Sequence, residues 1–256
     1  MKIIPIAIGL LFFIQISLSG CVTTEESSYS SHSTEKNALE QRLTLARRYI
    51  GDSNWDDAKR NLKLAMKIKP NDPEVYEVYA LFHQSTGEHD LAEEYFLESI
   101  KLRPDFSRAR NNYAAFLYMQ NRYEEARVQL LEVTSDALYS ARPQAFINLG
   151  MCQLNLDDRA GAKRSFKKAL LMDSDNVLAL VEMGHIAYEQ GELKEAWRYF
   201  ETQRSSVTRQ SSRALWLGII VSRKLGDLDS EASLSLMLKS LYPDSMEYQV
   251  YSREWQ

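Results

Sequence analysis

The chain is dominated by a segment of about thirty-four residues that recurs six times. Units that begin at Leu39, Pro73, Ser107, Pro143, Val177 and Ser211 are separated by 34, 34, 36, 34 and 34 residues. Three positions within the unit keep the size of their side chain. Position 8 is small (Ala46, Ala80, Ala114, Gly150, Gly184, Gly218), position 20 is small (Ala58, Ala92, Ala126, Ala162, Ala196, Ser230), and position 24 is large (Leu62, Phe96, Leu130, Phe166, Phe200, Leu234). Such a period is typical of solenoids, in which each unit packs only on its neighbours.

Small side chains at positions 8 and 20 allow the first helix of a unit (helix A) to approach the second (helix B), and position 24 fills the space between them. Gly87 and Gly191 stand where the A-to-B turn is expected, and Pro70 stands where a B helix ends. This pattern resembles tetratricopeptide repeats from Leu39 to Pro243. The resemblance predicts an all-α fold, a right-handed superhelical solenoid of six helix pairs over 39–244, with units near 39–72, 73–106, 107–142, 143–176, 177–210 and 211–244.

The end of the chain, residues 245–256, predicts one more helix. Asp244 or Ser245 can cap its first turn, and Tyr248, Tyr251 and Trp255 then share one face. A solenoid needs a cap that covers its last unit, so we expect a C-terminal capping helix. A tail that binds a partner is the alternative.

The first residues have the pattern of a lipoprotein signal peptide, which we assign to residues 1–20. Lys2 precedes an apolar run that is too short to span a bilayer, and Leu18-Ser19-Gly20-Cys21 resembles the bacterial lipobox. The resemblance implies cleavage before Cys21, a covalent lipid on its thiol as the chain's only prosthetic group, and, with Val22 rather than Asp next to it, sorting to the outer membrane. In the alternative, Cys21 is incidental to a plain signal peptide. Residues 21–38 are rich in Ser and Thr and predict a flexible tether after the lipidated cysteine.

Composition excludes several classes of function. With 31 basic and 35 acidic residues the net charge is −4, which argues against nucleic acid as a partner. Two cysteines and four histidines, among them His83 and His89, have no metal-ligand spacing, so no metal site is expected. Cys152 has no His near it in the sequence, and no phosphate loop or catalytic carboxylate pair is present. We therefore expect no enzyme activity and no small-molecule substrate.

The concave side of the solenoid is the candidate binding surface. Positions 2, 5, 9 and 12 of each A helix turn toward it, and they are unusually apolar. Such a groove suits an amphipathic helix or an extended peptide from a partner protein. In the alternative, curvature presses successive A helices together and buries part of this stripe. The candidate groove residues are Leu43, Leu81, Tyr118, Ile147, Met151, Leu154, Val181, Tyr188 and Leu215.

The lipobox, the polar segment and the six units, in this order and length, resemble the type IV pilus biogenesis and stability lipoproteins of the PilF/PilW family. The units around Tyr49–Pro70 and Glu88–Pro104 contribute most to the resemblance. It implies a pilotin at the periplasmic face of the bacterial outer membrane, which binds type IV pilus secretin subunits and promotes their localisation and multimerisation.

Two other functions remain open at this point, because tetratricopeptide arrays serve many partners. One is an adaptor lipoprotein that scaffolds peptidoglycan enzymes or outer-membrane barrel assembly. The other is a peptidoglycan-active enzyme or its direct activator.

Overall fold

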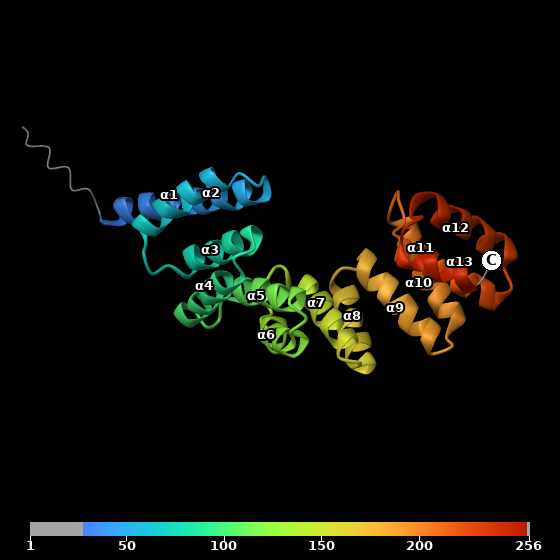
Figure 1. Ribbon diagram of the computed structural model, residues 1–256. Coiled ribbons are helices and arrows are strands. Elements are labelled where there is room, and N and C mark those ends of the chain that lie inside the picture. The colour runs from blue at the N-terminus through green and yellow to red at the C-terminus, as the bar shows by residue number, and fades with distance from the viewer. Residues whose placement is uncertain (1–27, 255–256) are drawn as a thin grey trace, which may run out of the picture.

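The computed structural model describes residues 28–254, and these form an elongated array of antiparallel helix pairs (Figure 1). The described part contains helices and no strand. The helices are α1 (Ser28–Gly51), α2 (Trp55–Ile68), α3 (Pro73–Thr86), α4 (His89–Leu102), α5 (Ser107–Met119), α6 (Tyr123–Ser135), α7 (Arg142–Asn155), α8 (Arg159–Met172), α9 (Val177–Glu189), α10 (Leu193–Ser205), α11 (Ser212–Leu225), α12 (Leu228–Leu241) and α13 (Met246–Glu254). Odd-numbered helices up to α11 are the A helices, and their even-numbered partners are the B helices.

Local sequence signals set the helix boundaries. The Asp72 carboxylate accepts a hydrogen bond from the Glu74 backbone N–H at 2.8 Å, and Pro73 occupies the first turn of α3. Gly87 ends this helix in the left-handed conformation, with a φ of 81°. Gly226 does the same at the end of α11, with a φ of 77°. These caps keep the A-to-B turns short, so that each pair is antiparallel.

The repeat positions that the sequence predicts to pack between the helices do pack there. Ala80, Ala92 and Phe96 of the second unit are fully buried, and so are Ala162 and Phe166 of the fourth. The A and B helices of every unit are in close contact, and each B helix also contacts the next A helix. The prediction of an all-α tetratricopeptide solenoid is therefore confirmed.

A methyl group added at position 8 of the fourth unit should destabilise the fold. A Cβ at Gly150 would lie 2.6 Å from Cε1 of the buried Phe166 ring, whereas a Cβ at Gly51 meets no atom within 4 Å. We expect Gly150→Ala to lower the free energy of unfolding by about 1–2 kcal/mol, because overpacking outweighs the gain in helix propensity. Gly51→Ala, the matched control, should leave stability unchanged or slightly raised. Urea denaturation followed by circular dichroism measures both, and equal effects would contradict the packing role of position 8.

The first helix begins earlier than the repeat predicts. α1 starts at Ser28, so the expected tether over 21–38 is wrong for residues 28–38. Once Leu39, Leu43 and Ala46 pack in the core, extending their helix adds one backbone hydrogen bond per residue without a new nucleus. Residues 34–37 are accordingly helical but exposed.

The signal peptide and Cys21 lie outside the described residues. No helix in the described part is both long and apolar enough to cross a membrane.

The final helix, α13, packs back on the last unit. The Ser245 hydroxyl accepts a hydrogen bond from the Tyr248 backbone N–H at 3.2 Å and caps the first turn. Tyr248 and Tyr251 pack against the apolar cluster of the fifth and sixth units, and α13 contacts α11. Trp255 lies outside the described residues. The helix thus has the placement of a terminal cap.

Candidate functional site: a groove between the fourth and fifth units

Polar side chains join most of the successive A helices on the side where these helices meet. α1 contacts α3, α3 contacts α5, α5 contacts α7, and α9 contacts α11, whereas α7 and α9 make at most a marginal contact. Each of the four tight junctions has its own hydrogen bond or ion pair: Arg47 Nη2 to Glu77 Oε2 at 2.6 Å, Asn112 Nδ2 to Glu77 Oε1 at 2.7 Å, Asn148 Nδ2 to Asn111 Oδ1 at 3.2 Å, and Arg213 Nη2 to Glu182 Oε2 at 2.7 Å.

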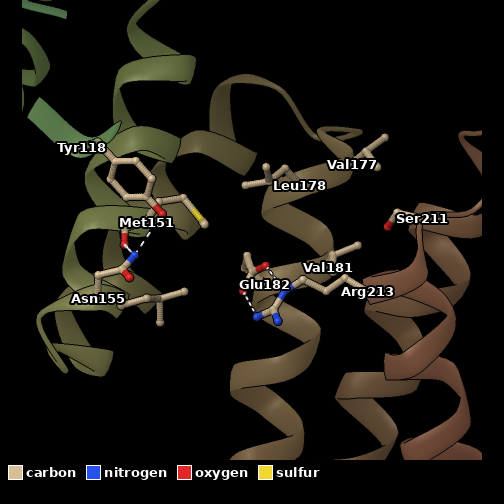
Figure 2. A pocket seen from close by; sticks show the side chains of 10 residues that line it. Tyr118, Met151, Asn155, Val177, Leu178, Val181, Glu182, Ser211 and Arg213 are labelled. Atoms are coloured by element: carbon tan, nitrogen blue, oxygen red, sulfur yellow. Dashed lines mark hydrogen bonds and ion pairs between the residues drawn. The ribbon is translucent and has the colours of Figure 1, made fainter. Parts of the chain in front are cut away.

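The junction between α7 and α9 differs, since no hydrogen bond or ion pair between side chains of the described chain joins these two helices. A cavity of about 650 Å³ opens there, which we call the α7–α9 groove. Figure 2 shows its two walls, with α5 and α7 on one side and α9 and α11 on the other. Its lining comes from these four helices and from Ser211, the N-cap residue of α11: Tyr118, Met151, Leu154, Asn155, Val177, Leu178, Val181, Glu182, Ser211 and Arg213.

Internal hydrogen bonds hold the polar groups of the two walls. On one wall, Asn155 Nδ2 donates to the Tyr118 hydroxyl at 3.0 Å and to the Met151 carbonyl oxygen at 2.9 Å. On the other, Arg213 donates from Nε and Nη2 to the two carboxylate oxygens of buried Glu182, at 2.5 and 2.7 Å. This hydrogen bonding raises the pKa of Arg213, so the guanidinium stays charged and the pair is neutral as a whole.

His185, three residues after Glu182 on α9, adds no charge near this wall. Burial, together with the nearby Arg213 guanidinium, lowers its pKa to about 4. Its Nε2 lies 3.3 Å from the Arg213 carbonyl oxygen. At neutral pH the imidazole is therefore neutral. Because the only charged lining groups compensate one another, the groove offers an apolar and electrically neutral surface.

The structure brings together four of the residues proposed from the sequence: Tyr118, Met151, Leu154 and Val181. Leu81 and Tyr188 are half-buried and lie outside this lining.

Leu43, Ile147 and Leu215 are buried in the core, so their placement on an open groove surface is wrong. All three stand at position 5 of their units, as does buried Val181. The physical reason is the curvature of the solenoid, which presses neighbouring A helices together along this position. Positions 9 and 12 stay partly open in the first five units, as at Met151 and Leu154.

Several lining residues were absent from the sequence-based set. Leu178 stands at position 2 of the fifth unit, which is one of the positions expected on the concave side, so the sequence could have identified it. Its side chain is 43% exposed. The Glu182–Arg213 pair had no signal in the sequence, because the two residues are thirty-one positions apart and meet only through the alignment of α9 with α11.

The described residues contain no group of three or more His, Cys, Asp or Glu side chains placed to hold a metal ion. Cys152 is fully buried, and burial raises the pKa of its thiol to about 12. At neutral pH this thiol is protonated and inaccessible, which is the state of a packed core cysteine and not of a nucleophile.

Repeat order, helix pairing and groove define a tetratricopeptide-repeat solenoid that presents an apolar site between its units. Family models described as tetratricopeptide repeats match residues 80–137 and 143–176. The type IV pilus assembly protein PilF of Pseudomonas aeruginosa is 33% identical over 247 residues, which cover 96% of this chain and 98% of that protein. The chain therefore belongs to the PilF/PilW family.

Two solved structures share this arrangement. That of Pseudomonas aeruginosa PilF superposes with a TM-score of 0.80 at 33% identity, covering 86% of this chain and 98% of the other. That of PilW, described as a widely conserved type IV pilus biogenesis factor, has a TM-score of 0.71 at 24% identity, covering 84% and 98%. The second likeness concerns the fold alone.

Proposed function

We propose that this protein acts in type IV pilus biogenesis as a pilotin, a lipoprotein that binds secretin subunits and promotes their multimerisation in the outer membrane. The observation that carries the proposal is the relationship to PilF, which extends over almost the whole of both chains. In this role the protein acts by recruiting another polypeptide and catalyses no reaction.

In this proposal the α7–α9 groove receives an apolar segment of the secretin subunit. Met151, Leu154 and Leu178 supply flexible apolar side chains that adapt to an inserted helix or strand. Asn155 Nδ2 and the Glu182 carboxylate already have hydrogen-bond partners within the walls, so an apolar segment can cover these groups without leaving them unpaired. Inserted between α7 and α9, such a segment would supply the contact that these two helices lack.

The secretin itself provides the direct test. Deletion of the gene is expected to remove secretin multimers from outer-membrane fractions and pili from the cell surface, and the intact gene supplied in trans should restore both. Immunoblots of unheated membrane fractions measure the multimers. Normal multimers together with normal surface pili in the deletion strain would reject the pilotin role.

Membrane attachment in this proposal depends on Cys21. We expect Cys21→Ala to move most of the protein from the membrane fraction to the soluble fraction or to leave an uncleaved precursor, because two or more acyl chains are needed for durable attachment. The repeats should fold unchanged, since the described solenoid begins only at Ser28. Fractionation followed by immunoblotting measures the shift, and mature protein that sediments undiminished with membranes would contradict the lipid anchor.

A further inference from the structure

We propose that the outer surface around the end of α8 is a second interaction surface, which contacts an anionic lipid bilayer. α8 contains five basic residues and no acidic residue, unlike the other B helices. The first two are neutralised within the fold, since Arg159 Nη1 lies 3.0 Å from Glu189 Oε2 and Lys163 Nζ lies 3.7 Å from Glu192 Oε2. The positive charge that remains therefore lies on Arg164, Lys167 and Lys168, from the middle of the helix toward its end.

All three of these cations are exposed. Arg164 and Lys167 have no hydrogen-bond or ion-pair partner among the described residues. Lys168 Nζ lies 5.2 Å from the centre of the Phe146 ring, and the Arg142 guanidinium carbon lies 5.5 Å from the same centre. Phe146 thus joins the start of α7 to the end of α8, so that four cations share one surface.

The nearby carboxylates of the α8–α9 turn only partly offset this charge. Asp173 Oδ2 accepts a hydrogen bond from Asn176 Nδ2 at 2.9 Å, and Asp175 Oδ1 accepts one from Ser174 Oγ at 3.2 Å. Asp136 also interacts electrostatically with Arg142, so three carboxylates stand against four cations and the surface keeps a net positive charge. Phosphate headgroups of an anionic bilayer complement such a surface.

Two leucines project from the same region. Leu171, in the last turn of α8, is 79% exposed, and Leu138, in the loop that leads to Arg142, is 95% exposed. Single leucines flanked by cations are the pattern of segments that insert a side chain at the boundary between headgroups and acyl chains. They do not form the contiguous apolar patch that a folded protein partner would cover, which favours a lipid surface over an acidic protein.

In an antiparallel pair the first helix begins where the second one ends, so the start of α7 and the end of α8 lie at the same end of the fourth unit. Arg142, Phe146 and Lys168 meet there. In addition to the proposed anchor at Cys21, the cationic surface would orient the solenoid on the bilayer.

A depth measurement tests the proposal. A fluorescent amino acid replaces Leu171 in the full chain, which is reconstituted into vesicles of phosphatidylethanolamine and phosphatidylglycerol that carry a lipid-linked quencher. The matched control carries the same amino acid in place of Leu97, a leucine of α4 that is 49% exposed and remote from α8 in sequence. We expect at least roughly twofold stronger quenching at position 171 than at position 97, since an interfacial side chain lies within reach of the acyl region.

The contrast should disappear in Lys167→Glu/Lys168→Glu and in vesicles of phosphatidylcholine alone, because both changes remove the charge attraction. Equal quenching at positions 171 and 97 on vesicle-bound protein would overturn the proposal. So would a probe at position 171 that responds to an added acidic peptide but not to the vesicles. The secretin measurements do not depend on this surface. A negative quenching result therefore leaves the pilotin role unaffected, and a negative secretin result leaves the proposed membrane surface unaffected.

Discussion

Leu178→Asp is expected to weaken the proposed capture of the secretin strongly while leaving the solenoid folded. Leu178 lines the α7–α9 groove, yet 43% of its side chain is exposed, so a carboxylate at this position stays hydrated in the free protein. When an apolar segment enters the groove, that carboxylate must lose its water without gaining a partner. A loss of about 2 kcal/mol or more at a central interface residue corresponds to a roughly thirtyfold weaker affinity.

The measurement combines co-purification of the secretin subunit with immunoblots of secretin multimers in outer-membrane fractions. Leu97→Asp is the matched control, since Leu97 is exposed to a similar degree but stands on α4, outside the groove lining. Circular dichroism should be the same for both variants and the original chain. Full multimer formation by folded Leu178→Asp protein would remove the α7–α9 groove from the site of secretin binding.

Arg213→Ala is expected to lower the free energy of unfolding by about 3 kcal/mol, because it leaves a buried carboxylate without its partner. Glu182 is buried beneath Arg213 and accepts both of its hydrogen bonds. The value is at the lower end for buried pairs, since half of the Arg213 side chain is exposed and water can partly replace it. The loss of this link between α9 and α11 also removes part of one groove wall.

The control for Arg213 is an exposed ion pair of the neighbouring unit. Arg204 Nη1 lies 3.3 Å from Glu201 Oε1, and about half of each side chain is exposed. Arg204→Ala should therefore cost less than about 1 kcal/mol. Chemical denaturation of the two variants under the same conditions measures the difference. Equal destabilisation would show that the Glu182–Arg213 pair does not stabilise the α9–α11 junction.

The thirty-four-residue period was sufficient to predict most of the fold, because the pattern arises from contacts within a helix pair and is repeated along the sequence. The requirement for a small residue at position 8 and a ring or leucine at position 24 arises inside one helix pair, as between Gly150 and Phe166. The sixth unit repeats this contact between Gly218 and Leu234, so the same chemistry appears at the same spacing in the sequence. The start of α1 at Ser28 was missed because extension of an existing helix needs no packing signal.

The candidate site was only partly predictable because it depends on contacts between units. Position 5 was assigned to the open surface, yet Leu43 and Leu215 are buried where neighbouring A helices meet. The sequence contains no periodic signal for the spacing of those helices. The wider junction between α7 and α9 follows from the packing of complete units, and the exposed Leu178 becomes a candidate only when that junction is visible.

The sequence by itself determined the helix pairs, their order and the side chains that lie between the helices of a pair, because these depend on contacts inside one unit, as between Gly150 and Phe166. Tertiary structure alone decided which face of the A helices stays open and which charges meet. Those outcomes depend on the angle between successive units, as in the pairing of Glu182 with Arg213 and the absence of such a link between α7 and α9 in the described chain. An angle of this kind is the sum of many small packing contacts, and no single residue type specifies it.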